Sequence, residues 1–489
     1  MNNRSAYLWF FFIFFVFTTI KLNGQTILTL ESSLEIARKN SPNIKKLELN
    51  VERSRQLLNA QNAALKSQFS LSITPFDYSQ DRSFNNFFST WYTNEIKQSY
   101  STFTISQPIK YTDGTLALIN QFTWRDAYSE YQNLRSKTFS NNLYLSYNQP
   151  IFTYNRTKMT LRELELDLEN TSLNYAIQML NLERLVAQSF FTVYQARMSL
   201  EIAKEELKNY EKNYEITQNK VNAGLAPLEE LYQAELNVAS SKSQVQNSEV
   251  SLENAKDNLK KLIGISLFEQ IDVVADVNYQ PIKIDLQKAI DHGLKYRMEL
   301  RQQKIDIENA YFNLIRTSAI NEFKGTVNLS YGIIGTDEKF QDIYNVPTKN
   351  QRVALSFNIP LFDWGEKRSR IKASEATIEV SKLDLDDEKK NIIIAIRNVY
   401  RNLKNLETQI ELARKNVENA QRTYDINLER YNNGDLTGMD LQLYQTQLSQ
   451  KKQSLINSLI SYKLELLNMK IQSLYDFEKD ESVVPSIIK

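Results

Sequence analysis

The chain offers few side chains that could carry out enzymatic chemistry. Its 489 residues include no cysteine and a single histidine, His292. Without cysteine there is no disulfide, no thiol nucleophile and no cysteine-ligated metal, and a lone histidine is expected to be structural or exposed. A phosphate-binding loop with its lysine is also missing, so the chain cannot drive work by nucleotide hydrolysis. We predict that the protein is not an enzyme and holds no metal or cofactor.

Two acidic residues stand at matching places after a glycine. Glu230 stands six residues after Gly224, and Asp440 stands six residues after Gly434. Thr437 and Asp440 also have the spacing of a helix capping box, and the helix dipole favours acidic groups in a first turn. From the residues alone, these carboxylates suit the first turn of a helix.

The segments that hold these residues belong to a duplicated pattern. Residues 146–152 reappear 210 positions later as residues 356–362. The openings of the two copies are related by a larger shift of 256 positions, which pairs Leu30 with Leu286. The two shifts differ by 46, so the first copy carries about 46 extra residues between its opening and residue 146.

Short stretches of both copies alternate apolar and polar residues. This alternation occurs in residues 69–74 and 143–148 of the first copy and in residues 327–333 and 353–358 of the second. A period of two places apolar side chains on one face of a strand and polar side chains on the other. We therefore predict amphipathic strands at these four places.

The extra residues of the first copy, about 76–137, hold further strand candidates. Residues 102–106 and 116–124 show the same alternation, and Asp113-Gly114 between them is a hairpin signal. The stretch 76–100 is rich in aromatic and polar residues without a clear period, and we predict a surface loop there. The insertion thus adds either a hairpin to the sheet or a lid outside it.

Each copy also predicts one helix before its strands and a helical hairpin after them. The opening helices are expected at residues 30–66 and 286–321. Apolar residues repeat every seven positions from Ile371 to Ala420, which predicts a left-handed supercoil with neighbouring helices. The corresponding helix of the first copy, about 155–220, would be on the order of 100 Å long at 1.5 Å per residue.

The predicted hairpins turn at glycine residues. Gly224 and Gly434 permit the left-handed conformation that ends many helices, and the returning helix of the first copy is expected to end near Ile263. Asp363 and Glu366 have capping-box spacing at the start of the second long helix, with Asp363 as the expected N-cap.

The N-terminus has the pattern of a secretory signal peptide. Arg4 precedes an apolar block at residues 6–20, and Gly24 offers a small residue for cleavage. About fifteen apolar residues are short of the roughly twenty that a spanning helix needs. No later stretch approaches that length, so any further membrane crossing is expected to use β-strands.

Together these features resemble the TolC-type outer-membrane efflux proteins, also called outer membrane factors. The resemblance is carried by the signal peptide, the two copies of helix, strand pair and helical hairpin, and the glycine-centred turns. The strand ends at residues 149–152 (Gln-Pro-Ile-Phe) and 359–362 (Ile-Pro-Leu-Phe) also match. The resemblance covers nearly the whole mature chain.

The resemblance implies an α+β membrane protein that assembles as a homotrimer. Family subunits each give about four strands to one shared twelve-stranded transmembrane β-barrel, which continues into a long α-helical coiled-coil barrel across the periplasm. The insertion makes six strands per subunit the alternative here. An open sheet edge in lipid leaves backbone groups unpaired, so a barrel shared between subunits agrees with the predicted strands.

The function implied by the resemblance is a passive exit duct in the cell outer membrane. It would serve a tripartite efflux or type I secretion system, contact outer-membrane lipid, and join a periplasmic adaptor (membrane fusion) protein to an inner-membrane RND, ABC or MFS pump. With 59 basic and 58 acidic residues, no nucleic-acid partner is expected. The alternative from another class is a secreted coiled-coil adhesin or scaffold, which the heptads fit but the amphipathic strand pairs do not.

The resemblance also assigns a periplasmic gate. Tyr431 and Asp440 take the positions of family gate residues around Gly434, and Glu230 stands at the matching place in the first copy. A ring of three carboxylates at a constriction would attract cations and repel anions. The basic residue that pairs with the gate in the family is replaced by Leu436.

Two other places receive roles in the same way. Pro150, Pro360 and Trp364 mark the strand-to-helix junction, where Trp364 either anchors at the membrane interface or packs against the junction. The hairpin tips correspond to the adaptor-docking turns of the family, although their glycines could serve only as caps. The docking candidates are Ala223, Gly224, Leu225, Asn433, Gly434 and Asp435.

The chain is thereby divided into five segments, of which two are repeats. The C-terminal tail is expected to be loosely ordered. The segments are the signal peptide 1–25, the first repeat 26–265, a linker 266–283, the second repeat 284–475 and the tail 476–489.

Overall fold

The computed structural model describes residues 26–485. The predicted signal peptide and the last four residues of the tail lie outside the described residues. The described chain divides into two compact units, each made of three separate stretches. The hairpin unit comprises residues 26–42, 182–281 and 403–466, and the sheet unit comprises residues 43–181, 282–402 and 467–485.

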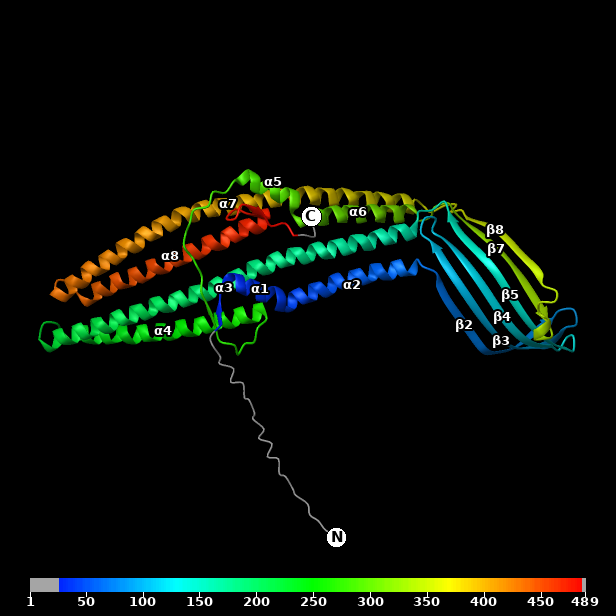
Figure 1. Ribbon diagram of the computed structural model, residues 1–489, viewed down its shortest axis with the longest axis horizontal. Helices are drawn as coiled ribbons and strands as arrows, with labels where there is room; N and C mark the ends of the chain where they lie inside the picture. The colour runs from blue at the N-terminus through cyan, green and yellow to red at the C-terminus, as the bar shows by residue number, and fades with distance from the viewer. Residues whose placement is uncertain (1–25, 486–489) are drawn as a thin grey trace, which may run out of the picture. The chain divides into compact units, whose positions relative to one another are not determined.

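Two long helical hairpins repeat at the predicted shift. The first consists of α3 (Arg156–Asn222) and α4 (Leu228–Ile263), and the second of α7 (Glu366–Asn433) and α8 (Gly438–Ser473). The helices α4 and α8 each contain 36 residues and begin 210 positions apart (Figure 1). The predicted hairpins and their glycine turns are therefore confirmed.

The opening helices differ from the prediction because each is broken in two. The first copy has α1 (Leu30–Asn40) and α2 (Pro42–Ala64), and the second has α5 (Leu286–Tyr296) and α6 (Met298–Ser318). The extended residue between the helices is Ser41 in one copy, with φ −58° and ψ 121°. This conformation follows from Pro42, since a proline ring disfavours the helical conformation of the residue before it.

The second break falls at the equivalent position, 256 residues later. Arg297 has φ −62° and ψ 127°, and its guanidinium donates to Glu299 and to Gln472. No proline imposes this break, so the side-chain contacts of Arg297 stabilise it.

Six strands form one antiparallel sheet in the sheet unit (Figure 1). The order is β2-β3-β4-β5-β7-β8, so the strands of this sheet lie side by side in chain order. The strands β3 and β4 have no counterpart in the second copy, so the insertion adds a hairpin in the middle of the sheet. The bounds are β2 Gln68–Asn85, β3 Thr90–Ile109, β4 Gly114–Ser129, β5 Leu134–Ile151, β7 Lys324–Asp337 and β8 Thr348–Asn358.

The surface loop predicted at residues 76–100 is wrong. The strands β2 and β3 run through this stretch and pair as far as Asn85 and Thr90, with only a short turn between them. A register shift between Thr74 and Asp77 interrupts their pairing. Such an irregularity changes which side chains face each side of the sheet, so the alternation that begins at residue 69 does not continue in phase.

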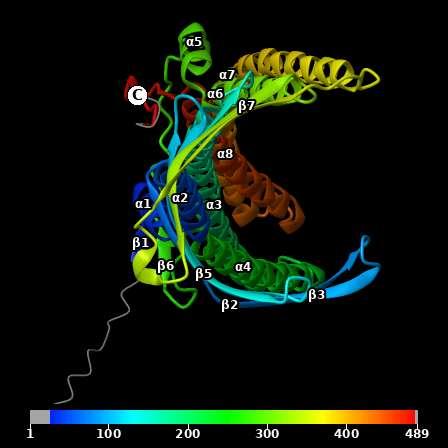
Figure 2. The same cartoon turned by 90° about the vertical axis from the view of Figure 1, so that its right-hand side faces the viewer.

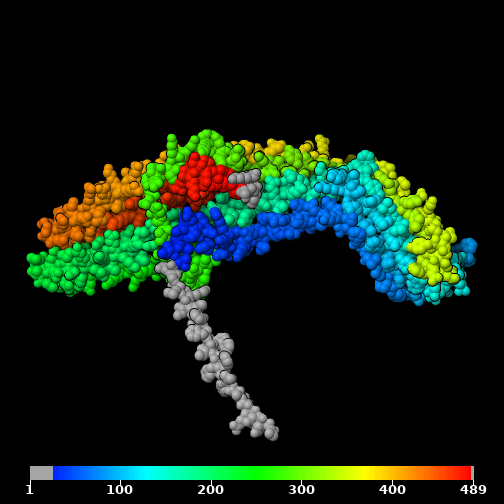
Figure 3. Space-filling model, viewed as in Figure 1, coloured from blue at the N-terminus to red at the C-terminus, as the bar shows by residue number. Residues whose placement is uncertain are grey.

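One face of the sheet is apolar, and the other is mainly polar. In register, Phe69, Ile105, Leu118, Leu145 and Tyr331 lie side by side on five consecutive strands. The sheet is curved (Figure 2). In the space-filling view its strands form one continuous layer from β2 to β8 (Figure 3). The opposite face carries Ser72, Thr102, Gln121 and Asn142 in register.

Small elements complete each unit. In the hairpin unit, β1 (Thr26–Leu28) pairs in parallel with β6 (Ile271–Val273), which lies in the predicted linker. In the sheet unit, β9 (Tyr475–Asp476) pairs with β10 (Glu481–Ser482), and Val484 is buried in a core cluster with Leu474. The described part of the tail therefore forms a strand pair and buries Val484, contrary to the loose order that was expected.

None of the helices within residues 26–485 combines the length and the apolar composition needed to cross a membrane.

Candidate functional site

The two hairpin turns in the hairpin unit have the same backbone geometry. Gly224 and Gly434 have φ values of +72° and +86°, and each donates its N–H to the carbonyl three residues earlier. The next residue, Leu225 or Asp435, donates to the carbonyl five residues earlier, at 2.8 and 2.9 Å. This pair of bonds is the Schellman motif, so both glycines act as helix caps.

The tips leave their side chains free of the helical core. The apolar side chain of Leu225, in the turn between α3 and α4, is 78% exposed. The other five docking candidates, at positions 223, 224, 433, 434 and 435, are also exposed. The structure therefore gives these residues a capping role and leaves them accessible.

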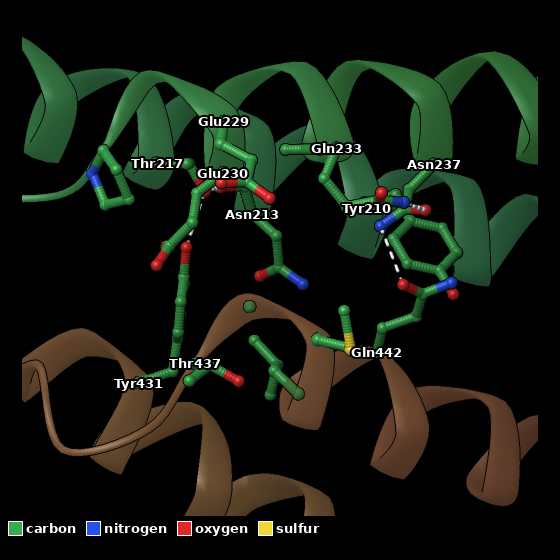
Figure 4. Close-up of a pocket in the computed structure, with 15 residues that line it drawn as sticks. Tyr210, Asn213, Thr217, Glu229, Glu230, Gln233, Asn237, Tyr431, Thr437 and Gln442 are labelled. Carbon is green, nitrogen blue, oxygen red and sulfur yellow. Dashed lines mark hydrogen bonds between the residues drawn. The ribbon is translucent and has the colours of Figure 1, made fainter.

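A buried tyrosine joins the two hairpins just behind the tips. The Tyr431 hydroxyl lies 2.5 Å from Thr217 Oγ1, and both residues are at most 3% exposed (Figure 4). The ammonium of Lys220 donates to the Tyr431 carbonyl and lies 4.1 Å from the centre of its ring. We call these contacts between Tyr431, Thr217 and Lys220 the latch, because they connect α7 with α3.

The surroundings of the latch favour a neutral phenol. Burial raises the pKa of Tyr431, and the charge of Glu230 adds to this increase, whereas the bond to Thr217 opposes it. Leu441 and Leu448 of α8 pack with Tyr431 in an apolar cluster.

A cavity of about 360 Å³ lies between the two hairpins beside the latch (Figure 4). Its lining includes Tyr431, Thr217 and Glu230 together with several amide side chains. Across it, the Asn237 amide donates to the Gln442 side chain at 3.0 Å, which links α4 with α8. The cavity is therefore polar on several sides and apolar where the cluster faces it.

The three predicted gate residues are only partly brought together. Tyr431 and Glu230 share the cavity, whereas Asp440 is exposed and does not line it. The Asp440 carboxylate accepts the Thr437 hydroxyl at 2.7 Å, and its backbone N–H donates to Thr437 Oγ1 at 3.2 Å. The capping interpretation of Asp440 therefore describes its contacts within one chain.

Sequence reasoning did not find Thr217 and Lys220. The first long helix has a seven-residue repeat from Leu161 to Tyr210, and Thr217 stands seven residues after Tyr210. A polar residue in such a stripe is a signal for a specific buried hydrogen bond. Its partner could not be read from the stripe, because Tyr431 is 214 residues away.

The predicted strand-to-helix junction lies in the sheet unit. Pro150 belongs to β5 and pairs with Thr326 of β7, whereas Pro360 and Trp364 lie between β8 and α7. Trp364 is 90% exposed, and its ring packs edge-on against Phe362 at 4.7 Å.

The expected capping box at this junction does not form. Helix α7 begins at Glu366, whose side chain pairs with Arg370 instead of reaching back. The Asp363 carboxylate accepts from the N–H groups of Gly365 and Lys367, and these bonds lower the pKa of Asp363. Asp363 therefore caps the helix from outside its first turn, since Trp364 and Gly365 both have positive φ.

A family model supplies the decisive comparison. The model described as outer membrane efflux protein matches residues 34–265 and 290–469, which is most of the chain. The chain belongs to this family.

The relatives that the chain resembles have low sequence identity to it. The outer membrane protein TolC of Salmonella enteritidis is 22% identical over 370 residues, which cover 73% of each chain. The cation efflux system protein CusC of Escherichia coli strain K12 is 22% identical over 278 residues, covering 56% of this chain and 59% of CusC. The Campylobacter jejuni CmeC outer membrane channel superposes with a TM-score of 0.69 at 15% identity, over 94% of this chain and 87% of CmeC.

Several sequence predictions are thereby confirmed. The protein has the TolC-like α+β fold of long helices and β-strands, and it is an outer-membrane efflux channel of the TolC and CusC type. Such channels are components of tripartite efflux systems and are not enzymes. The alternative of a secreted adhesin or scaffold is set aside by the family match.

Proposed function

We propose that three copies of this chain enclose one passive exit duct, which a periplasmic adaptor protein joins to an inner-membrane pump of the RND, ABC or MFS class. The observation that supports this most directly is the amphipathic sheet, in which β2 and β8 each pair on one side only. Unpaired edge groups are costly in lipid. Further copies of the chain would pair these edges and enclose the polar face.

Mass and conductance test this proposal together. Native mass spectrometry of the detergent-extracted protein should give three chains, and the same preparation should form ion-conducting pores in planar bilayers. A monomer that forms no pore would overturn the proposal.

We further propose that the hairpin tips dock the adaptor. The six tip residues are exposed, and Leu225 presents an apolar side chain that the subunit does not bury. Burial of such an apolar group by a partner is favourable. The glycine caps then serve docking indirectly, because they fix the shape of the turns.

A charged substitution separates docking from capping. Leu225→Asp should abolish adaptor-dependent export while the trimer still assembles, since the side chain contributes nothing to the cap. Ala239→Asp, at an exposed position of α4 about four turns away, is the matched control and should leave export intact. Unchanged export by the Leu225 variant would contradict docking at this tip.

The latch supports a closed gate at the same end. Separating the two hairpins requires the Tyr431–Thr217 bond and the contacts of Lys220 to break, and Glu230 lies in the adjoining cavity. We propose that these contacts hold the duct closed until the adaptor binds. Asp440 would add negative charge near the opening, although its carboxylate also accepts the hydroxyl of Thr437, the residue that caps α8.

Cation block distinguishes the charge of Asp440 from its cap. Asp440→Ala should weaken block by a divalent cation about tenfold, as expected for a carboxylate ring that attracts cations. Thr437→Val removes the cap partner but keeps the charge, so it should retain the block. Equal loss in both variants would show that the Asp440 carboxylate acts only through its bond to Thr437.

We also propose that the chain is divided into two repeats. Two repeats, 26–265 and 284–475, would be joined by the linker 266–283. The equal lengths of α4 and α8 support this division.

A further inference from the structure

The insertion of the first copy lies inside the membrane sheet. The strands β2 and β5 correspond to β7 and β8 by their positions in the repeat, so β3 and β4 are the added pair. Both added strands are paired along nearly their whole length. The strand β3 pairs with β2 and β4, and β4 pairs with β3 and β5. The added hairpin is thus a continuous part of the wall.

The chemistry of the added strands matches that of the wall. Ile105 and Leu118 of the added hairpin continue the apolar row that runs between Phe69 and Leu145. On the other face, Thr102 and Gln121 continue the polar row. Both faces of the added hairpin therefore suit the same surroundings as the faces of the other four strands, with lipid on one side and water on the other.

The two edges of the six-stranded sheet are compatible with each other. Every neighbouring pair in the sheet is antiparallel, and six is an even number, so β2 and β8 run in opposite directions. The β8 edge of one copy can therefore pair with the β2 edge of the next in the same antiparallel manner. Apolar side chains reach both edges, with Leu71 on β2 and Val353 on β8 both well exposed.

We propose that the assembled channel has an eighteen-stranded barrel, closed by pairing of β8 with β2 of the adjacent copy. This inference rests on the three-chain assembly proposed above. With strands ~4.8 Å apart and tilted by ~40°, eighteen strands give a backbone diameter of ~36 Å, against ~24 Å for twelve. The outer-membrane section is then about 1.5 times wider than that of a twelve-stranded family member.

Cysteine cross-linking tests the pairing, because the natural chain contains no cysteine. Val353→Cys on β8 is combined singly with Phe69→Cys, Leu71→Cys or Ile73→Cys on β2, and the protein is treated with a short bismaleimide. At least one combination should give covalently linked trimers on denaturing gels. The matched controls combine Val353→Cys with Leu116→Cys or Leu118→Cys on β4, which lie on the same face, and should stay monomeric.

The outcomes separate this inference from the assembly on which it rests. A cross-link to β4 instead of β2, in a preparation whose native mass is three chains, would overturn the eighteen-stranded barrel and leave the trimer standing. A native mass of two chains would overturn the trimer itself. For variants that fail to fold, cryo-electron microscopy of the unmodified channel decides the question: eighteen strands in cross-section support the inference, and twelve contradict it.

Discussion

The hydroxyl of Tyr431 and Thr217 Oγ1 lie 2.5 Å apart, and this buried bond connects the two helical hairpins. Tyr431→Phe removes one buried hydrogen bond, which is worth about 1 kcal/mol. If the bond exists only in the closed duct, we expect its loss to raise the equilibrium constant for opening about fivefold per subunit. Open probability in planar bilayers measures this change.

Tyr444→Phe provides the control for the latch. Tyr444 of α8 packs against the same apolar cluster but lies outside the latch, so loss of its hydroxyl should leave gating unchanged. Equal effects of the two variants would show that general loosening of the cluster opens the channel.

Alkaline pH should destabilise the hairpin unit through a second tyrosine. Burial, helped by the charges of Asp425 and Glu205, raises the pKa of Tyr424 to about 12, whereas an unfolded phenol titrates near 10. The folded state holds the proton more tightly, so this contribution to stability is complete below about pH 10 and is lost as the pH rises through about 12.

The variant Tyr424→Phe has no phenol at this position and should lose less stability over that pH range. Thermal unfolding followed by circular dichroism measures the difference. Tyr232→Phe, at a largely exposed position, should behave like the natural chain. Identical pH profiles for all three proteins would rule out this role of Tyr424.

Replacing a capping glycine should lower stability through backbone conformation alone. Gly434 has φ +86°, and a Cβ added there meets no atom within 4 Å. Gly434→Ala should therefore destabilise the turn by about 1 kcal/mol, the usual cost of a left-handed conformation for an L-residue. Gly438→Ala is the control, because Gly438 begins α8 with ordinary contacts and should tolerate alanine. A melting temperature that is equally low in both variants would contradict an effect that is specific to the left-handed conformation of Gly434.

A tight contact in the sheet unit predicts a specific rescue. A Cβ at Gly293 of α5 would lie 2.8 Å from Ile396 Cδ1 of α7. We expect Gly293→Ala to lower stability by about 1–3 kcal/mol through overpacking. Adding Ile396→Val removes the clashing methyl group and should restore part of the melting temperature. Failure of the double variant to recover would place the strain at Gln472, whose carbonyl is the next nearest atom.

The duplication allowed the long helices to be predicted, but not the breaks in the opening helices. A constant shift of 210 requires matched hairpins, which α4 and α8 confirm. The break at Ser41 is marked by Pro42, but the break at Arg297 depends on Gln472, which is 175 residues away. A contact of that kind has no signature in the local sequence.

The sheet was harder to predict for a different physical reason. The register shift between Thr74 and Asp77 interrupts the alternation, so a long strand pair has the appearance of an aperiodic loop. The latch shows the same limit, since Thr217 follows the heptad pattern while its partner belongs to the other copy. Patterns predict the elements here, and long-range contacts decide how they are interrupted and joined.

The chain enters the sheet twice, after α2 and after α6, and returns each time to a long helix, α3 or α7. Because every visit begins and ends on the helical side, it must contain an even number of strands. The bore of such a channel therefore changes by one whole hairpin at a time. Insertion or deletion of a single strand would place the following helix on the wrong side of the bilayer. Lengths between the two helices of each copy should accordingly vary among relatives in discrete steps and not continuously.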